Sequence, residues 1–362
     1  MTTTDLRTIH EDHGATMDTV GGRAVPEDYG RPERTHRAVR NGVGVTEMPY
    51  GVLVVEGSDR VGYVDNVVSN RVPAPDEGGC YAVICSPQGR VEVDLYIYSG
   101  ADRVLILTPP GRARALADGW EVFIEDVEIT VASDRFVVFG VHGPSATEKL
   151  ASVLSGAQPP EAPLTFVRGS LEDHGVTVAR TDAPTGEEGF EVVCSRDAAP
   201  AVFETLLTRG LNAVPFGRRA WLSLTLEAGT PLFESELEGR IPNVLGLRNA
   251  LDFDKGCYVG QEVVSRIENR GHPNERLVGM VPEAVPQAGA SVLAGDRTVG
   301  EVTRATRSPI REEPIALAVV DYDLPDDEPL AIRVDGEPVP ATTTPLPFVE
   351  GSERSARIPT YG

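Results

Sequence analysis

The segment KGCYVGQE, residues 255–262, is the stretch from which the fold of this 362-residue chain can be assigned. It contains Lys255, which with Lys149 makes up all the lysine among 33 basic residues. Two glycines within this segment allow backbone conformations that other residues avoid and a close approach by a ligand. A helix is predicted over residues 260–268, and a helix start beside the Lys255 ammonium favours the thiolate form of Cys257. The residue types equally support a second interpretation, a buried structural cysteine in a tight turn.

The overall composition is strongly acidic. The chain has 33 basic and 55 acidic residues, a formal net charge of −22, and its acids are spread along the whole sequence. This charge argues against non-specific binding to DNA, to other nucleic acids or to anionic membranes. A dispersed acidic surface with almost no lysine is typical of a halophilic protein, because salt near 1 M shortens the Debye length to about 3 Å and screens self-repulsion. An ordinary acidic cytosolic protein is the alternative.

Sequence patterns argue against several classes of protein. No run of 18 apolar residues occurs, so no membrane span is expected, and the N-terminus lacks the basic and apolar regions of a signal peptide. We therefore expect a cytoplasmic protein with reduced thiols, since four scattered cysteines do not form a disulfide framework. No group of histidines and cysteines has metal-ligand spacing, so no metal ligand is assigned.

The chain length predicts two or three domains. Residues 1–32 are polar and charged and are expected to be a lead-in. Residues 33–274 alternate predicted strands and helices in two units, including a strand at 122–131, and should form a mixed α+β body. Short strands between Gly, Pro and Asp turns predict a β-barrel over residues 275–350, followed by a tail over residues 351–362. The predicted barrel strands are residues 277–281, 291–293, 300–306, 315–320, 331–334 and 339–342.

Two carboxylates lie inside predicted strands. In VEVDLYIY, residues 91–98, aliphatic and polar residues alternate, so Asp94 faces away from the aliphatic side together with two tyrosines. In GEEGFEVVC, residues 186–194, Glu191 lies in an apolar strand, where a buried carboxylate needs a partner because an unpaired charge is costly. A solvated strand face is the alternative for both residues.

KGCYVGQE, followed by Arg266 and by Arg270-Gly271, resembles the signature of the YgfZ-type folate-binding proteins. The chain is also similar from end to end to the glycine-cleavage T-proteins, which are aminomethyltransferases. The similar segments include GEEGFE at residues 186–191, LEAGTPL at residues 226–232 and GEVT at residues 300–303. This resemblance implies an α+β fold of the GcvT type, with two intertwined subdomains and a C-terminal β-barrel in a ring around a tetrahydrofolate pocket.

The resemblance also implies roles for individual residues. Glu191 maps to the glutamate that holds the pterin ring of tetrahydrofolate. Asp94 maps to the catalytic aspartate, although the family's Asp-Asp-Leu is Val93-Asp94-Leu95 in this chain. Cys257 and Lys255 are the further catalytic candidates, with Lys255 expected to tune the thiol or to position a ligand. The further candidates for binding folate are Tyr258, Gln261 and Arg266.

Three segments depart from the T-protein pattern. TEMPYG at residues 46–51 replaces Asp-Val-Ser-His-Met-Gly, and Ala220-Trp221-Leu222 replaces Ala-Arg-Asp. GCYVGQE at residues 256–262 replaces Gly-Asp-Phe-Ile-Gly-Arg-Glu. The chain therefore retains the scaffold and part of the folate site, but not the full pattern for aminomethyl transfer.

The resemblance to the YgfZ-type proteins leads to one hypothesis of function. The protein would bind tetrahydrofolate and support iron–sulfur cluster assembly or repair, extending to tRNA modification, through its cysteine motif. The alternative is a tetrahydrofolate-dependent aminomethyltransferase of the glycine cleavage system, and a third hypothesis is a non-catalytic folate-binding module. The expected partners are folate and either an iron–sulfur protein or a lipoyl-carrier protein.

Overall fold

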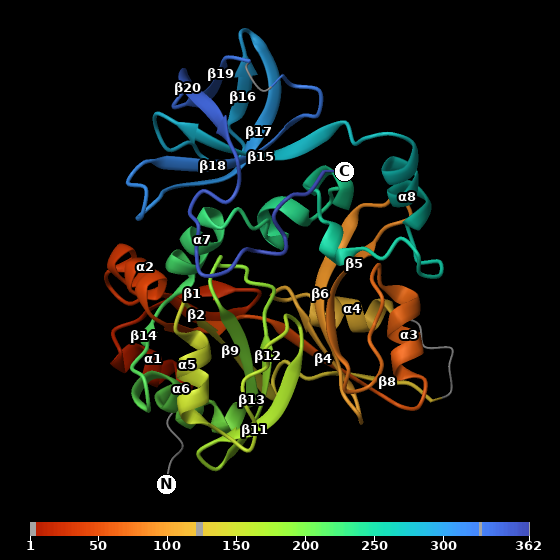
Figure 1. The fold of residues 1–362 in the computed structure, drawn as a ribbon, viewed down its shortest axis with the longest axis vertical. Coiled ribbons are helices and arrows are strands. Elements are labelled where there is room, and N and C mark those ends of the chain that lie inside the picture. Colours follow the sequence, from red (N-terminus) through yellow and green to blue (C-terminus); the bar gives the residue numbers. More distant parts are fainter. Residues whose placement is uncertain (1–4, 121–125, 326–327, 362) are drawn as a thin grey trace.

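The computed structural model of the protein describes residues 5–120, 126–325 and 328–361. Its fold is mixed α+β, with two sheets side by side and a closed barrel above them (Figure 1). No helix among these described residues is long and apolar enough to span a membrane. The helices, together with short 3-10 and π turns, are α1 (Leu6–Asp12), α2 (Pro32–Asn41), α3 (Arg60–Val67), α4 (Ala113–Gly119), α5 (Ala146–Val153), α6 (Ala199–Thr208), α7 (Arg218–Glu227), α8 (Gln261–Arg270), η1 (Arg196–Ala198), η2 (Phe233–Leu237), η3 (Pro242–Leu245) and η4 (Arg248–Ala250).

The first sheet has seven strands in the order β10-β11-β12-β13-β9-β3-β14, and only the pairing of β14 with β3 is parallel. Its central strands are nearly continuous apolar runs, because α5 and α6 pack over a core that these strands share. The strands are β3 (Gly44–Met48), β9 (Phe136–His142), β10 (Leu154–Ser155), β11 (Phe166–Leu171), β12 (His174–Arg180), β13 (Gly189–Ser195) and β14 (Val214–Pro215).

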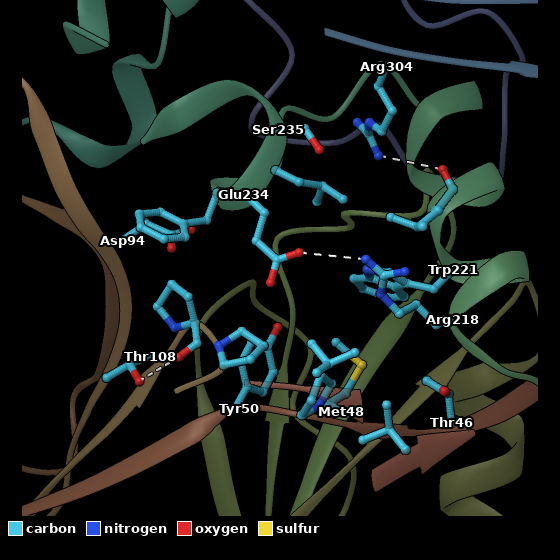
Figure 2. A pocket seen from close by; sticks show the side chains of 18 of the residues that line it. Thr46, Met48, Tyr50, Asp94, Thr108, Arg218, Trp221, Glu234, Ser235 and Arg304 are labelled. Carbon is cyan, nitrogen blue, oxygen red and sulfur yellow. Dashed lines mark hydrogen bonds and ion pairs between the residues drawn. The ribbon is translucent and has the colours of Figure 1, made fainter. Parts of the chain in front are cut away.

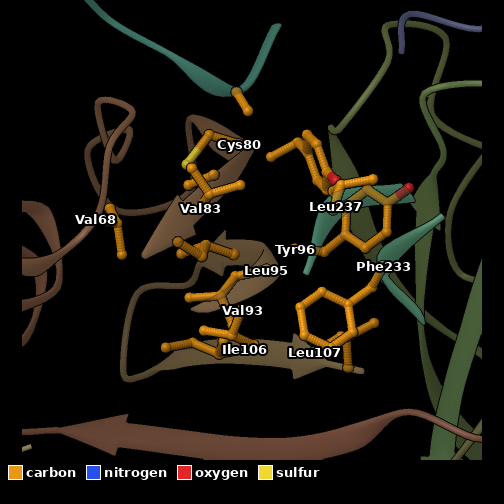
Figure 3. Packing of buried hydrophobic residues seen from close by; sticks show 14 of the residues in the cluster. Val68, Cys80, Val83, Val93, Leu95, Tyr96, Ile106, Leu107, Phe233 and Leu237 are labelled. Carbon is orange, nitrogen blue, oxygen red and sulfur yellow. The ribbon is translucent and has the colours of Figure 1, made fainter. Parts of the chain in front are cut away.

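The second sheet has five strands in the order β5-β6-β7-β4-β8. Both of its faces are covered, since Val93 and Ile106 point toward Val68, whereas Tyr96 and Leu107 point toward Phe233 and Leu237 of η2 (Figure 3). Of the strand predicted at residues 122–131, the structure has β8 from residue 128, and residues 122–125 lie outside the described part. The strands are β4 (Gly51–Glu56), β5 (Gly78–Cys85), β6 (Val91–Ser99), β7 (Val104–Thr108) and β8 (Glu128–Val131).

The C-terminal barrel closes in the order β15-β18-β17-β16-β19-β20, and all six strands predicted from the sequence are present. Alternation along β18 sends Ala316 and Ala318 into the barrel core, while Leu317 and Val319 join the core of the body. One strand therefore ties the barrel to the rest of the molecule. The strands are β15 (Glu275–Pro282), β16 (Ser291–Ala294), β17 (Arg297–Arg307), β18 (Pro314–Asp321), β19 (Leu330–Val334) and β20 (Glu337–Thr344).

The N-terminal segment has regular structure that the sequence analysis did not predict. It forms α1 and a hairpin of β1 (Thr16–Val20) and β2 (Arg23–Asp28), and α2 follows from Pro32. His10 of α1 is fully buried and lies 3.1 Å from the Glu47 carboxylate and 2.9 Å from the Tyr29 hydroxyl. These polar contacts hold the segment against β3, and a hydrophobic pattern alone does not reveal them.

A buried carboxylate, that of Glu227 at the end of α7, joins three parts of the fold. His36 and Arg40 of α2 lie 2.8 and 3.2 Å from its Oε2 atom. The Ser308 hydroxyl, in the turn between β17 and β18, donates to Oε1 at 2.5 Å. Burial opposes the charged form, but His36 and Arg40 outweigh it and hold the pKa of Glu227 below its usual value.

We expect Glu227→Gln to lower the free energy of unfolding by about 3–5 kcal/mol, because it leaves buried donors and the Arg40 charge without their partner. The native pKa is lowered, so this stabilisation is present above the unfolded pKa and is lost as the pH falls through the native value. Urea unfolding at neutral and acidic pH measures both effects. Glu11→Gln, which breaks the exposed Arg7–Glu11 pair, is the control and should cost less than about 1 kcal/mol. Equal effects of the two substitutions would contradict the role of Glu227.

Candidate functional site

A cavity of about 510 Å³ lies where the β1–β2 hairpin, both sheets, α7, η2 and the barrel meet. Its size suits a ligand of drug-like dimensions. Apolar and aromatic wall residues such as Met48 and Trp221 are interspersed with polar and charged groups (Figure 2). The polar and charged wall residues are Thr46, Glu47, Tyr50, Asp94, Tyr96, Thr108, Arg218, Glu234, Ser235, Gln287, Thr303, Arg304 and Arg357.

Asp94 lies on β6 and lines this cavity together with Tyr96, as the alternation along the strand predicts. It is 8% exposed, so the alternative of a solvated strand face is wrong. The Tyr81 hydroxyl donates to its Oδ2 atom at 2.7 Å, and the Arg357 guanidinium lies 3.5 Å from the same oxygen. Burial raises the pKa of Asp94, and Arg357 and Tyr81 oppose that rise. The carboxylate is fixed in position and suited to proton exchange with a ligand.

Arg357 reaches the site from the chain segment that follows the barrel. Its Nε atom donates to Asp182 at 3.0 Å, and its guanidinium also contacts the Tyr96 hydroxyl. It lies over the Tyr81 ring, 4.1 Å from the ring centroid. The Tyr96 hydroxyl in turn donates to Asp182 at 2.5 Å. One cation therefore holds two carboxylates and two tyrosines in a fixed arrangement.

The C-terminal segment is held by its backbone as well. The Ala356 amide donates to the Asp182 carbonyl and the Thr360 amide to the Gly246 carbonyl, each at 3.0 Å. The Tyr361 hydroxyl donates to the Val244 carbonyl at 2.8 Å. The same hydroxyl accepts from the Leu277 amide of β15 at 2.7 Å, so Tyr361 lies between η3 and the start of the barrel (Figure 1). This return path is what inserts Arg357 between the two sheets.

Glu191 lies on β13 next to this cluster but is not among the described residues that line the cavity. The Tyr98 hydroxyl donates to its Oε2 atom at 3.2 Å, and Tyr50 provides a second hydrogen bond. Tyr50 itself lines the cavity, so this hydrogen bond links Glu191 to the cavity wall. Burial raises the pKa of Glu191 to about 7, partly offset by the Tyr50 hydrogen bond, and the charge of Asp182 adds to the rise.

The cluster beside the cavity has more acceptors than cations. Asp94, Asp182 and Glu191 share the field of the Arg357 guanidinium, which partly opposes the rise that burial causes in the pKa of Asp94 and of Glu191. Three buried carboxylates face one guanidinium, and tyrosine hydroxyls provide their other described hydrogen bonds. A ligand that presents several N–H donors matches this excess, because buried charges require hydrogen-bonding partners.

Lys255 of the KGCYVGQE segment is buried, and its ammonium is bound by the end of α3. The Nζ atom donates to the carbonyl oxygens of Asp65, Val68 and Asn70 at 2.5, 2.9 and 2.9 Å. These groups include carbonyls that a helix leaves without partners at its C-terminus. The described contacts of Lys255 therefore hold the segment against α3.

The remainder of the segment forms a surface loop at a distance from the cavity wall. Cys257 is exposed, so the interpretation as a buried structural cysteine is wrong, whereas Cys80, Cys85 and Cys194 are buried. Gly260 has φ of 84° and lies so close to the Ser86 carbonyl that a Cβ atom would be 2.5 Å from it. Tyr258 is 8% exposed. The Gln261 side-chain amide donates to the Lys255 carbonyl at 3.3 Å. Arg266 pairs with Glu262 at 2.9 Å on the exposed face of α8.

Cys257, Tyr258, Gln261 and Arg266 are all absent from the described residues of the cavity wall. The structure thus brings Asp94 to the cavity wall and joins Glu191 to that wall through a hydrogen bond with Tyr50, while the cysteine motif lies elsewhere. No group of three or more His, Cys, Asp or Glu residues in the described ranges is arranged to hold a metal ion.

Comparison with known proteins agrees with this architecture. Residues 6–255 match the GCVT N-terminal domain, and residues 275–350 match the glycine cleavage T-protein C-terminal barrel domain. The chain belongs to the glycine-cleavage T-protein family. It is 31% identical to an aminomethyltransferase of Thermus thermophilus over 96% of this chain and 99% of that protein. It is 30% identical to an aminomethyltransferase of Corynebacterium aurimucosum over 95% and 96% of the two chains.

The fold comparison gives the same result. The crystal structure of the glycine cleavage system aminomethyltransferase T from Bartonella henselae superimposes with a TM-score of 0.86 over 97% of this chain and 98% of that one. Sequence identity across that superposition is 22%, so this comparison establishes the fold. Both relatives are named aminomethyltransferase. The comparisons therefore support the resemblance to the T-proteins better than the resemblance to the YgfZ-type proteins.

Two residues of the site escaped the sequence analysis. Asp182 lies in the connection after β12, and Arg357 lies in SARIPTYG, residues 355–362, within the predicted tail. The available signal was the composition of that segment. An arginine, an isoleucine, a proline and a tyrosine within eight residues are unusual for a disordered end. The partner of Arg357 could not be read from the sequence, because more than 170 residues separate it from Asp182.

We expect Glu191→Gln to change how stability depends on pH. The native pKa of about 7 exceeds the ordinary value of 4.5, so the folded protein binds this proton more tightly than the unfolded chain. The free energy of unfolding of the wild-type protein should therefore decrease as the pH rises from 4.5 to about 7, and this group should account for about 3 kcal/mol of that decrease. The Gln variant should lack that component, whereas Glu11→Gln should retain it. Urea unfolding from pH 4.5 to 8 tests this, and an unchanged slope in Glu191→Gln would mean that the carboxyl is already charged in the native state.

Proposed function

We propose that the protein binds tetrahydrofolate in the central cavity and acts there as an aminomethyltransferase. The observation that carries the proposal is the buried Asp94 carboxylate at the cavity wall, fixed by Tyr81 and Arg357. Membership of the T-protein family and relatives named aminomethyltransferase over nearly the whole chain support it.

The residues present fit a reduced pterin. Its ring presents several N–H donors on one edge, and the cluster of Asp94, Asp182 and Glu191 offers more acceptor atoms than Arg357 occupies. Trp221 and Met48 provide the apolar surface that flat heterocycles require. Asp94 lines the cavity and can reach such a ligand directly, whereas Glu191 is not among the described wall residues.

Tetrahydrofolate supplies nucleophilic nitrogen atoms that accept a one-carbon unit. Asp94 would orient the ligand and accept a proton from a reacting nitrogen, since its raised pKa brings the carboxyl closer to neutrality. Arg357 would keep that carboxylate in place and compensate its charge between proton transfers. The apolar wall would exclude water, so that the one-carbon unit passes to the ligand rather than to solvent.

The test is turnover of an aminomethyl-lipoyl carrier protein with tetrahydrofolate, measured as methylenetetrahydrofolate and ammonia. We expect wild-type activity, and a loss of about a hundredfold or more in kcat for Asp94→Asn with a small change in the Kd for tetrahydrofolate. Asp102→Asn, on the exposed pairs with Arg103 and Arg168, is the matched control and should retain activity. Binding of tetrahydrofolate without any turnover, in the presence of a competent carrier and high salt, would reject aminomethyl transfer and leave folate binding alone.

A second candidate function rests on the exposed Cys257. It is the cysteine that the structure exposes, it lies outside the central cavity, and it belongs to the motif that resembles the YgfZ-type proteins. The second proposal is therefore support of iron–sulfur cluster assembly or repair, with Cys257 acting at the surface toward a protein partner.

Genetic complementation separates the two proposals. In a host that lacks the gene, the activity of iron–sulfur enzymes should be restored by the wild-type gene but not by Cys257→Ser, because serine lacks a thiolate. Glycine-cleavage activity in the same strains should follow Asp94→Asn instead. Full restoration of iron–sulfur enzymes by Cys257→Ser would remove the evidence for this second function.

A further inference from the structure

Three arginines line the central cavity, and they differ in how firmly they are bound. Arg357 is held by Asp182, Asp94 and Tyr96. Arg304 is 9% exposed; it donates to the Thr225 hydroxyl at 2.8 Å and to the Thr230 carbonyl at 2.6 Å, and lies 3.4 Å from Glu236. Both guanidinium groups are therefore committed to the protein.

Arg218, the first residue of α7, is bound weakly by comparison. Its side chain is 32% exposed and lies 3.6 Å from the carboxylate of Glu234, which is 51% exposed. That separation is too long for a hydrogen bond, and an exposed pair of this kind is easily broken. Within the described ranges, no hydrogen bond and no second ion pair involves the Arg218 side chain. It is thus the cavity cation that is available to a ligand.

The position of Glu234 points to the chemical class of that ligand. Figure 2 shows its side chain reaching across the cavity toward Arg218, with Trp221 beside the arginine. The protein's own carboxylate therefore lies where an anionic group would bind Arg218. Arg218 and Trp221 are three residues apart on α7, so both face the cavity from one side of the helix.

We propose that Arg218 is a carboxylate-binding subsite of the cavity, and that the carboxylate tail of the ligand displaces Glu234 from it. The inference rests on the proposed function, in which the ligand is a reduced pterin with an aromatic middle part and a glutamyl tail. Trp221 then contacts the aromatic part, while Arg218 determines that tailed pterins are preferred over pterins without a tail.

The exchange of carboxylates is physically favourable. The Arg218–Glu234 pair contributes little, and a released Glu234 side chain keeps its charge in water. A ligand carboxylate can meet the planar guanidinium with two parallel hydrogen bonds, which the 3.6 Å pair does not form. The net charge of −22 repels an anionic ligand, so a local cation at the cavity is required for its tail to bind.

The experiment is calorimetric titration of three compounds into wild-type protein, Arg218→Gln and Glu234→Gln. The compounds are tetrahydrofolate, 6-methyltetrahydropterin, which lacks the tail, and p-aminobenzoylglutamate, which is the tail alone. Arg218→Gln should raise the Kd of the two tailed compounds about tenfold and leave that of the tail-free pterin unchanged. Glu234→Gln should lower the Kd of the tailed compounds by up to about fivefold, because it removes the competing carboxylate.

Arg219→Gln is the matched control, since this neighbouring arginine is 57% exposed, pairs with Asp28 at 3.3 Å and lies outside the cavity wall. It should leave all three dissociation constants unchanged, and thermal unfolding checks that each variant is folded. If Arg218→Gln binds tetrahydrofolate as wild type does, or weakens all three compounds equally, the subsite is refuted while the proposed function stands. If wild-type protein binds neither pterin, the proposed function fails; binding of the tail compound that depends on Arg218 would then still support the subsite, and its absence would refute both.

Discussion

The arrangement of the cavity depends on one buried carboxylate, that of Glu227. Its oxygens accept from α2 and from the turn between β17 and β18, while its backbone carbonyl accepts from the amides of Phe348 and Val349. The helix that it ends carries Arg218 and Trp221 into the cavity wall, and the barrel strands that it fixes carry Thr303 and Arg304. A charge is tolerated at this buried position because several donors surround it. The parts of the protein that form the site are therefore positioned by a polar junction, whereas the hydrophobic cores hold each part together internally.

The carboxylates of the polar cluster at the cavity are less fully compensated than that of Glu227. Glu227 has its donors in the folded protein, but burial raises the pKa of Asp94 and of Glu191, and Arg357 opposes that rise only in part. This costs stability in the ligand-free protein, and in the proposed function a donor-rich ligand reduces the cost on binding. Such a site is less stable than the scaffold could make it, which is a common property of binding sites. Tyr50 and Tyr98 limit the cost through their hydrogen bonds to Glu191.

Local patterns predicted the parts of the fold that local physics decides. Alternation placed Asp94 on the correct face of β6, and the spacing of turn residues predicted all six barrel strands. Each of these patterns depends only on residues that are close together in the sequence. The N-terminal hairpin and α1 were missed, since His10 is held there by Glu47 and Tyr29 rather than by an apolar stripe. The contact of Arg357 with Asp182 and the hydrogen bond of Tyr50 with Glu191 depend on how distant segments meet. The sequence could name Asp94 and Glu191, but it did not reveal Asp182 and could not show that only Asp94 of these three lines the described cavity wall.

The two lysines illustrate why residue chemistry must be combined with geometry. Lys149 donates to the carbonyls of Arg209 and Leu211 just beyond the end of α6, at 2.5 and 2.7 Å, as Lys255 does at the end of α3. A compact ammonium with three donors can meet several converging carbonyls, whereas the flat guanidinium of arginine directs its donors in one plane. In a chain where nearly every other cation is arginine, lysine thus occurs where carbonyl oxygens at a helix end converge on a buried cation. Lys255 anchors the KGCYVGQE loop in this way, and that anchor, together with the close contact of Gly260 with the β5–β6 turn, holds Cys257 at the protein surface.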